Sequence, residues 1–546
     1  MTTTAQRSVD PSRYSKPRAA VLIGVHVLIG LHIAHWLVAK RTLAPLELNE
    51  VMYTLELGIV TAGFLLMVGA ALSVALFGRF FCGWACHILA LQDLAAWLFA
   101  KAGVVAKPVR SRLLRFAPFG AVFYMFVWPQ ILRLANGEPF PTFHVASPED
   151  PWASFATDDF WRNLPGPWIA GLTFLICGFL VVYLLGSRSF CANACPYGAA
   201  FSLLDRIAPG RIALKGKCTD CARCTAVCQS GVWVHEEVQR FGKVVDPACL
   251  KDLDCIAVCP EQALGFGFRM PAGFGRRTNG ATRKRGFHLS VGEDVLAGAT
   301  LLASLLVYRE LYSTVPFLMS LGIGCALAWL AVMSLRLTKN AHVVLRGLTL
   351  RKDHCLTRSG RTFAAGLLLV FAFTIHSGFV RFHEFAGARA YVATTEAMAR
   401  RDVAGVRHHL PLAVAHLETC SAWGLWNPVE LDRRLADLHA HGPTPAQADH
   451  YLDRVVAADP SAHGARVRRL LRRIRGGQHD AAEKDLALID AALDSAGALP
   501  DRDDLLAGAL AAHEQLAVVR EQQGHADSGA AHRRRVELLQ RERGSH

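Results

Sequence analysis

The sequence is short of charged residues, and acidic ones are the scarcer kind. Of its 546 residues 19% are charged, with 45 Asp and Glu against 59 Lys and Arg, while 52% are hydrophobic. This balance favours a membrane protein over an ordinary soluble one, and the length exceeds that of a single ordinary domain. The net charge of +14 would suit nucleic acid. The basic residues lie beside apolar segments, however, which indicates lipid headgroups and membrane topology, so we expect no nucleic-acid partner.

Catalytic side-chain sets and a disulfide framework are also absent. No combination of residues suggests acid–base or nucleophilic catalysis, so any chemistry would come from a bound cofactor. Cysteine nearly disappears after residue 381, where Cys420 is the only one of the chain's 15. Most of the others gather in short, regular runs, which indicates thiolates in a reducing compartment and not the disulfides of a secreted protein.

Two runs of cysteines stand close together in the middle of the chain. One has the spacing C-x2-C-x2-C-x3-C, which is that of bacterial ferredoxins. Its members are Cys218, Cys221, Cys224 and Cys228. The second has the spacing C-x5-C-x3-C-P, so one cysteine of the pattern is missing and Asp252 stands in its place. Its members are Cys249, Cys255 and Cys259. A structural zinc site needs only four ligands, whereas these two runs together hold seven cysteines. We therefore favour iron–sulfur clusters over zinc.

Residues 215–268 resemble a two-cluster ferredoxin domain. The resemblance implies two ligand sets, because the fourth cysteine of each run serves the other cluster. Cluster one would take Cys218, Cys221, Cys224 and Cys259, and cluster two Cys249, Cys255, Cys228 and Asp252. A carboxylate binds iron less firmly than a thiolate does. We therefore expect cluster two to be either a [4Fe–4S] cluster with an Asp252 ligand or a [3Fe–4S] cluster with an empty corner. Gln229 stands directly after the first run, where the ferredoxin pattern usually has a proline.

Apolar runs long enough to cross a membrane separate the loops. The expected spans are 19–38, 52–77, 115–134, 167–186, 293–310, 315–335 and 362–380. No small-residue cleavage site follows the first, so we expect a retained helix and not a signal peptide. Basic and acidic loops alternate, and by the positive-inside rule the basic loops face the cytoplasm. We therefore expect a protein of the bacterial inner membrane whose cysteine runs lie on the cytoplasmic side. The same rule places everything after about residue 381 in the periplasm.

We therefore expect a mainly α-helical, multi-span membrane protein with an inserted ferredoxin-like domain and a soluble helical C-terminal domain. The expected parts are a basic cytoplasmic tail at 1–18, transmembrane regions at 19–186 and 292–380, the iron–sulfur domain at 187–291 and a periplasmic helical domain at 381–546. In the last, two helical hairpins at about 460–495 and 505–540 resemble degenerate tetratricopeptide repeats, although their spacing exceeds the ~34-residue unit. A plain helical bundle is the alternative, and in both cases we expect a protein partner.

Two further cysteine pairs stand where expected membrane spans meet the cytoplasm. They are Cys82 with Cys86, and Cys191 with Cys195. On a helix, residues four apart share a face, so each pair would present two thiols side by side. The four thiols could jointly bind a third iron–sulfur cluster or a soft metal ion such as Cu(I), or they could be buried free thiols. The first pair followed by His87 also mimics a stretched haem c attachment site, but its internal position argues against that.

These motifs together give the chain a family resemblance over roughly residues 50–270. Paired cysteines at membrane ends followed by a two-cluster ferredoxin domain resemble the NapH/NosR/CcoG group of membrane polyferredoxins. NapH-type proteins are quinol dehydrogenase components, NosR-type proteins supply electrons in nitrous oxide respiration, and CcoG-type proteins are copper-handling oxidase assembly factors. Two features depart from the group: His87 replaces the proline after the first pair, and the flavin-carrying N-terminal domain of NosR-type proteins does not precede the spans.

Histidines within the expected spans are candidates for a second kind of site. Ionisable residues inside a bilayer are costly and often functional. The four are His26, His32, His35 and His376. They could contact quinol, hold a haem b, or be satisfied by backbone and water. The remaining cysteines fit no ligand spacing; they are Cys177, Cys325, Cys355 and Cys420.

The resulting hypothesis is an integral membrane iron–sulfur protein that transfers electrons and is not a stand-alone enzyme. It would pass electrons between the quinone pool or a cytoplasmic donor and a respiratory reductase or partner complex. One alternative is a copper-reducing assembly factor for a respiratory oxidase. The other is a redox-sensing membrane regulator whose helical C-terminal domain gives the output. Donor, acceptor, direction of flow and oligomeric state do not follow from the sequence.

Overall fold

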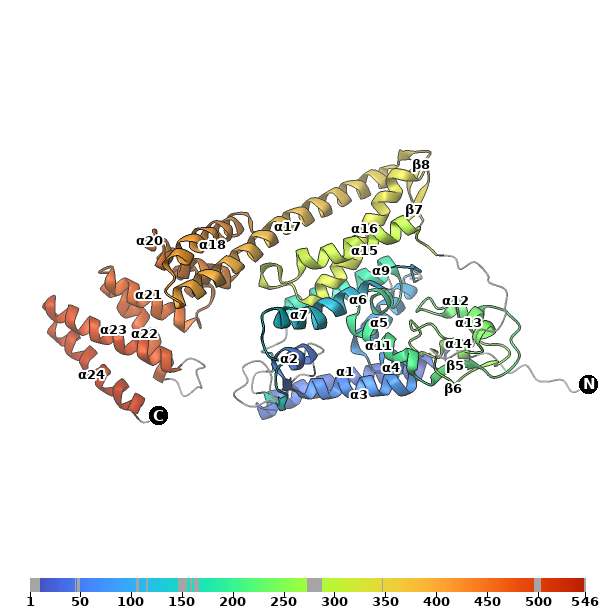
Figure 1. Ribbon diagram of the computed structural model, residues 1–546, viewed down its shortest axis with the longest axis horizontal. Coiled ribbons are helices and arrows are strands. Elements are labelled where there is room, and N and C mark those ends of the chain that lie inside the picture. The colour runs from blue at the N-terminus through green and yellow to red at the C-terminus, as the bar shows by residue number, and fades with distance from the viewer. Residues whose placement is uncertain are drawn as a thin grey trace, which may run out of the picture. The chain divides into compact units, whose positions relative to one another are not determined.

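The structure is a computed structural model that describes residues 10–44, 46, 50–104, 108–113, 116–145, 155–157, 160–161, 166–272, 287–345, 347–494 and 502–544. It is mainly α-helical (Figure 1). The chain divides into two compact units. The first comprises Met1–Glu310 with Thr314–Phe373, and the second comprises Leu311–Ser313 with Thr374–His546.

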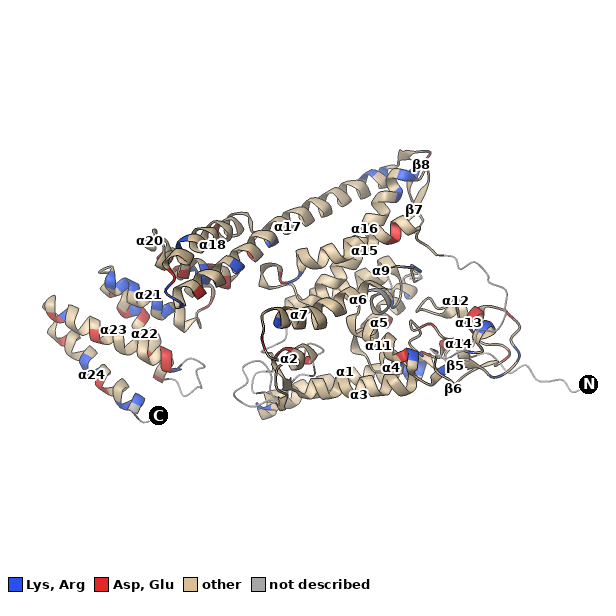
Figure 2. Ribbon diagram, viewed as in Figure 1, with Lys and Arg blue, Asp and Glu red and all other residues tan. Residues whose placement is uncertain are grey.

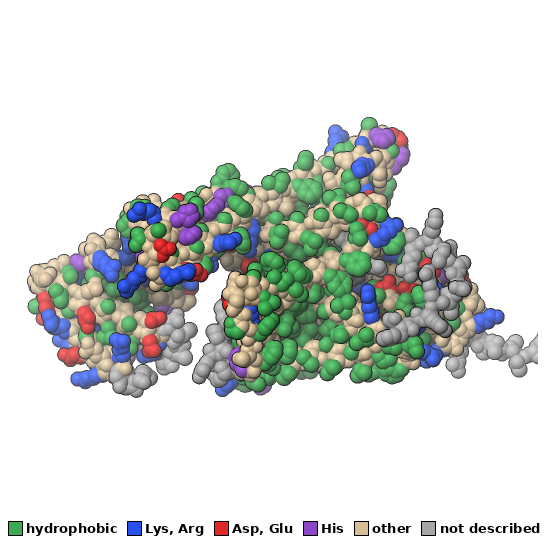
Figure 3. All heavy atoms as spheres, in the orientation of Figure 1, with side chains coloured by type: hydrophobic (Ala, Val, Ile, Leu, Met, Phe, Trp, Pro, Cys, Tyr) green, Lys and Arg blue, Asp and Glu red, His purple; other side chains and the backbone are tan. Residues whose placement is uncertain are grey.

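Within the described residues, five helical stretches are long and apolar enough to cross a membrane. They are α1 (Ser15–Ala39), Pro167–Leu185, α15 (Val291–Tyr308), α16 (Phe317–Lys339) and α17 (Arg358–Ala399). The second consists of α8 (Pro167–Phe174), the π-helical η3 (Leu175–Leu180) and α9 (Val181–Leu185). These stretches overlap five of the seven expected spans. Many of their large apolar side chains are exposed, and hydrophobic atoms dominate the face of the first unit seen in Figure 3.

The other two expected spans are more broken than predicted. The stretch 52–77 forms two helices, α2 (Glu50–Leu57) and α3 (Ala62–Phe77), with the short strand β2 (Ile59–Val60) between them. Gly58 turns the chain there with a φ of 78°, and the buried Glu50 carboxylate accepts the Gly63 N–H at 2.6 Å. The stretch 115–134 forms α6 (Ala117–Val122), η2 (Phe123–Val127) and α7 (Trp128–Ala135). The π-helical η2 precedes Pro129, which cannot donate a backbone hydrogen bond.

The ferredoxin-like segment is built on two antiparallel strands. β5 (Gly210–Leu214) pairs with β6 (Leu264–Phe268), with Ile212 opposite Phe266. Between them lie α12 (Arg223–Val227), α13 (Val234–Phe241) and α14 (Asp254–Ala257). Because the strands close the segment at both ends, the two cysteine runs between them are folded onto each other. The shared core contains Ile212, Val232, Val234, Val238, Val244, Leu253 and Leu264.

Both paired-cysteine motifs form a short helix, a break and a longer helix. The first consists of α4 (Phe80–Trp84) and α5 (His87–Lys101), and the second of α10 (Ser189–Asn193) and α11 (Pro196–Ile207). The expectation that each pair lies on one continuous helix is therefore wrong. Cys86 and Cys195 are extended residues at the start of the longer helix, with ψ of 119° and 115°. A proline disfavours helix at the residue before it, which explains Cys195, and the first motif breaks in the same way before His87.

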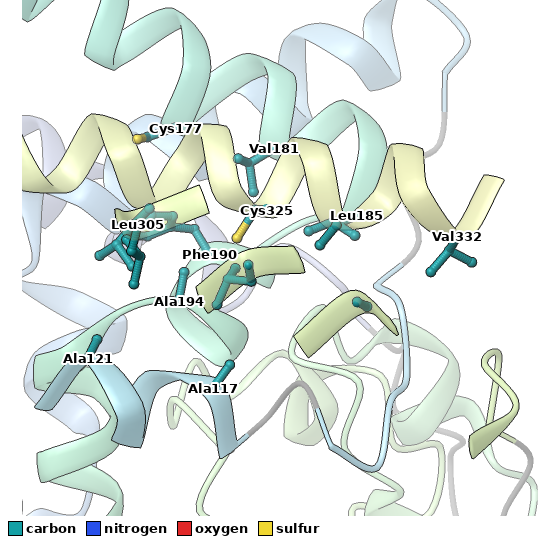
Figure 4. Close-up of a cluster of buried hydrophobic side chains, with 14 of the residues drawn as sticks. Ala117, Ala121, Cys177, Val181, Leu185, Phe190, Ala194, Leu305, Cys325 and Val332 are labelled. Atoms are coloured by element: carbon teal, nitrogen blue, oxygen red, sulfur yellow. The ribbon is translucent and has the colours of Figure 1, made fainter. Parts of the chain in front are cut away.

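An apolar core anchors the second motif among the membrane-type helices. Phe190 and Ala194, on either side of Cys191, point into it with Val181, Leu305 and Val332 (Figure 4). The smaller elements of the first unit are three sheets of short strands. They are β1 (Thr42–Leu43) with β4 (Ala156–Thr157), β2 with β3 (His144–Val145), and β7 (Val343–Leu345) with β8 (Leu348–Lys352) and β9 (Cys355–Leu356).

The second unit is helical and carries far more charge on its surface than the helices of the first unit (Figure 2). Besides η5 (Leu311–Ser313) and the later part of α17, it contains α18 (Val403–Trp423), α19 (Val429–His441), α20 (Pro445–Ala458), α21 (His463–Arg475), α22 (His479–Asp494), α23 (Arg502–Gln522) and α24 (Ala526–Gly544). The pairs α21–α22 and α23–α24 form helical hairpins at the places predicted for them. They share a leucine- and alanine-rich core that includes Leu470, Leu486, Ala509 and Leu516.

Candidate functional site

The first group of cysteines lines one pocket in the ferredoxin-like segment. Its four members come from both runs: Cys218, Cys221, Cys224 and Cys259. His235, Val238 and Leu264 complete the walls. Burial, followed by the neighbouring thiols, raises the pKa of Cys224 to about 11. The structure thus brings together the set that the ferredoxin pattern implies for cluster one.

The second group is more deeply buried and adjoins the first. Cys249 and Cys255 are buried in the core of the segment, with Cys228 partly buried against it. Burial, with contributions from Asp252 and Cys249, raises the pKa of Cys228 to about 12. Burial also raises the pKa of Cys255 well above its ordinary value, with Asp252 again contributing. Such thiols become thiolates only when a metal centre compensates their charge.

Asp252 lies beside this second group but already has partners. Its carboxylate forms a buried ion pair with Arg188, and its Oδ1 accepts the Asp254 N–H at 3.3 Å. Arg188 also binds Asp93, with Nε 3.1 Å from Oδ1. Arg18 joins the same network through Asp93 at 3.0 Å. Buried charges are tolerated when they are paired in this way. Asp252 therefore ties the ferredoxin-like segment to α5 and to the start of α10.

The third group consists of the four paired-motif cysteines, which the fold brings together from two places in the chain. Cys82 and Cys86 pack with Cys191 around Leu89 and Leu250. Cys195 adjoins Cys86 in one neighbouring cluster and Cys82 in another. Burial, with contributions from the other thiols of the group, raises the pKa of Cys86 to about 12 and of Cys195 to about 11. The arrangement can present four sulfurs to one buried centre.

Polar groups that sequence reasoning missed surround these sulfurs. Gln92, fully buried in α5, donates its Nε2–H to Cys191 Sγ at 3.1 Å. The Gly198 N–H donates to Cys195 Sγ at 3.3 Å. The buried Arg79 guanidinium acts on Cys82 and Cys191 as a nearby positive charge. Hydrogen bonds to sulfur are one way in which proteins set the potential of an iron–sulfur centre. A sequence signal did exist for the arginine, because Arg79 and Arg188 each stand three residues before the first cysteine of a pair.

The remaining candidates have ordinary partners. In α1, His26 contacts the Leu22 carbonyl, His32 the Leu43 carbonyl and His35 the Thr42 hydroxyl, each at 2.9 Å. His376 contacts the Trp423 carbonyl at 2.9 Å. Cys177 and Cys325 lie in the apolar core of the membrane-type helices, Cys420 is buried in the second unit, and Cys355 is exposed. Within the described ranges, no three His, Cys, Asp or Glu side chains are grouped so as to hold a single metal ion.

Comparison with known proteins gives one family match and several relatives. A 4Fe-4S binding domain matches residues 59–102 and 167–215, which contain all four cysteines of the third group and end before Cys218. The methylamine utilization ferredoxin-type protein MauN of Methylobacillus flagellatus is 29% identical over 172 residues, 31% of this chain and 52% of that protein. The ferredoxin-type protein NapH of Haemophilus influenzae is 26% identical over 222 residues, 38% of this chain and 69% of that protein.

A third relative is the putative electron transport protein YccM of Escherichia coli, 25% identical over 219 residues, 39% of this chain and 57% of that protein. The chain thus spans between about half and 69% of the length of these relatives. No solved structure matches.

The apolar helices, the cysteine groups and the match to a 4Fe-4S binding domain point to a class, that of membrane iron–sulfur proteins. Within that class the chain is similar to NapH-type ferredoxin proteins, as its motifs predicted.

Proposed function

We propose that the protein is an inner-membrane electron carrier with three iron–sulfur clusters, one on each cysteine group. It would pass single electrons between the quinone pool or a cytoplasmic donor and a respiratory reductase or other partner complex. The observation that carries this proposal is the convergence of Cys82, Cys86, Cys191 and Cys195 on one buried point, inside the two segments that match a 4Fe-4S binding domain. When bound, each cluster would supply a one-electron couple that no side chain here can supply.

The residues around the groups differ in a way that orders them from surface to interior. Cys221 of the first group is exposed, whereas Cys249 and Cys255 of the second are buried. In the third group Cys191 is buried, while Cys82, Cys86 and Cys195 are partly buried among α4, α5, α10 and α11. A soluble partner would therefore approach most closely at Cys221 of the first group, while the third group lies beside the membrane-type helices. This order suits a carrier that links a soluble partner to the bilayer.

The sidedness of the proposal follows from charge. Arg110 and Arg112, from the loop between α5 and α6, lie on the same side as the ferredoxin-like segment. The Arg110 guanidinium stacks on Trp233 at 4.1 Å and donates to the Gly231 carbonyl at 3.1 Å. Basic loops favour the cytoplasm, so we place the ferredoxin-like segment there and the helical second unit in the periplasm. The hairpins of that unit, whether or not they are tetratricopeptide-like, would bind a protein partner.

A quinol site is supported by an apolar pocket between α9, α15 and α16. Its walls include Leu185, Leu301 and Val332, and His288 and Arg336 stand at its polar end. Burial, with Arg110 and Arg336, lowers the pKa of His288. Its Nδ1 accepts the Arg110 N–H at 3.1 Å, so the neutral ring would offer Nε2–H as a donor. Apolar walls with few polar groups are typical of small-molecule sites. We therefore place the quinol in this pocket and not at the four span histidines.

The experiment is a redox titration of the purified protein, followed by EPR and combined with iron and sulfide counts. Three separable clusters are expected, and quinol in detergent or vesicles should reduce at least one of them. Counts that fit only the two ferredoxin-type groups would contradict the proposal.

A further inference from the structure

We propose, resting on the function above, that residues 247–254 form a relay between the second and third cysteine groups, with Gly83 and Trp84 as the residues that position it. We call these residues the relay loop. It begins two residues before Cys249, which belongs to the second group, and it contacts the first paired motif at Gly83 and Trp84. Neither the family match nor the ferredoxin pattern assigns a role to this contact.

The contact is made through Leu250, the residue after Cys249. Leu250 is 2% exposed and packs on Cys191, Cys82 and Cys86. A Cβ atom at Gly83 would overlap the Leu250 carbonyl oxygen. Glycine permits such a close approach of two backbones because it has no side chain. Leu250, which follows Cys249 in the chain, therefore packs directly against thiols of the third group.

Hydrogen bonds from the first motif fix the loop on both sides of Leu250. The Trp84 indole donates its N–H to the Lys251 carbonyl at 3.0 Å. Arg79 donates from Nη1 to the Pro247 carbonyl at 3.0 Å, and its Nη2 lies 3.5 Å from the Cys191 carbonyl. Arg79 thus touches the relay loop and the second paired motif together.

The second motif holds the far end of the loop through the equivalent arginine. Arg188, which is fully buried, pairs with Asp252. Lys251 is held in turn by the buried Asp205 of α11, with Nζ 2.8 Å from Oδ1. Asp205 also accepts the Arg79 N–H at 3.1 Å. Each half of the repeated motif therefore contributes one arginine to the same loop, Arg79 through carbonyl oxygens and Arg188 through a carboxylate.

This geometry suits an electron step between the two groups. The cluster held by one group would lose one electron and the cluster held by the other would gain it, with no bond made or broken and no proton required. The loop offers a covalent path from Cys249 to Leu250 and then a packed contact to Cys191. Gly83 and Trp84 contact the relay loop through its backbone and belong to neither ligand set, so they act by positioning.

The test compares Gly83→Ala with Gly69→Ala, and Trp84→Phe with Trp97→Phe, in the purified, cluster-loaded protein. Gly69 has no atom within 4 Å of an added Cβ, and Trp97 is 54% exposed. Trp84→Phe keeps an aromatic ring beside Phe80, which stacks on Trp84 at 5.0 Å, and it removes the indole N–H; Trp97→Phe controls for the smaller ring. The readouts are iron and sulfide content, magnetic coupling between the reduced centres in EPR, and hydrogen exchange of the Leu250 and Lys251 amides.

We expect Gly83→Ala and Trp84→Phe to keep their iron, to lose or weaken the coupled EPR signal and to exchange the loop amides faster than the wild type. The two control variants should match the wild type. If Gly83→Ala sheds iron, Trp84→Phe decides the question by the same readouts. Wild-type coupling and exchange in iron-replete Gly83→Ala or Trp84→Phe protein would overturn the relay. Failure of the proposed function would look different, because the wild type itself would then lack iron on the third group.

Discussion

The guanidinium of Arg188 and the carboxylate of Asp252 form an ion pair in which Arg188 is fully buried and Asp252 is 6% exposed. Asp252 occupies the position where the ferredoxin pattern has a cysteine, and Arg188 belongs to the second paired motif. Asp252 thus lies beside the second cysteine group and also belongs to the ion-pair network that holds the ferredoxin-like segment in place. Arg188 and iron would compete for the Asp252 carboxylate, so this ion pair bears on whether Asp252 serves as the fourth ligand of the second cluster.

We predict that Asp252 makes the second cluster the labile one. A carboxylate is a harder ligand than a thiolate, and this carboxylate is shared with Arg188. The iron that it holds should therefore be the first to be lost on oxidation. Air-oxidised wild-type protein should show the EPR signal of an oxidised [3Fe–4S] centre, and Asp252→Cys should show much less of it. Absence of the signal in the wild type, or an equal signal in the variant, would mean that Asp252 is not a ligand.

The hydrogen bond from Gln92 to Cys191 should raise the reduction potential of the third centre. An N–H pointing at a ligand sulfur stabilises the more negative, reduced state. Gln92→Leu keeps the bulk of the side chain and removes the donor, so the potential should become more negative. Gln447→Leu, at an exposed position of the second unit, serves as control. A redox titration followed by EPR measures both, and an unchanged potential in Gln92→Leu would show that the bond has no such role.

The second unit should lose stability as the pH falls, because of a histidine pair. The Nδ1 atoms of His513 and His532 lie 2.8 Å apart, and the other ring nitrogens face Asp490 and Glu483. Burial is the main cause that lowers the pKa of His532. A histidine with a lowered pKa in the folded state binds fewer protons there than when unfolded, so its contribution is present above its ordinary pKa and is lost on acidification.

Hydrogen exchange in α23 and α24 should therefore accelerate between about pH 7 and 5 beyond its intrinsic pH dependence. Arg520 and Arg535, which pair with Glu483 and Asp490, hold the carboxylates in place over the same range. His532→Gln should flatten the response, while His525→Gln, on the exposed turn before α24, should not. An equal response in all three proteins would assign the pH dependence elsewhere.

What the sequence could predict here depends on how local the cause is. The cysteine spacing was enough to group Cys259 with Cys218, because the ferredoxin pattern pairs the two runs within one short segment. It was not enough to find the pairing of Arg188 with Asp252, which joins residues far apart in the chain. The break before Cys195 follows from Pro196, but the same break before His87 has no such local signal. Gly58 and buried Glu50 likewise divided an apolar run that hydropathy alone presents as one helix.

The four paired-motif cysteines should together hold one cluster, and iron counting tests this directly. Cys82→Ser and Cys191→Ser, made separately, should each lower the iron content by about four per chain, since a [4Fe–4S] cluster is held by four cysteines. Cys355→Ser, which removes an exposed cysteine outside the groups, should leave the content unchanged. A full iron complement in both paired-motif variants would show that no cluster is bound there and that these thiols are packing residues.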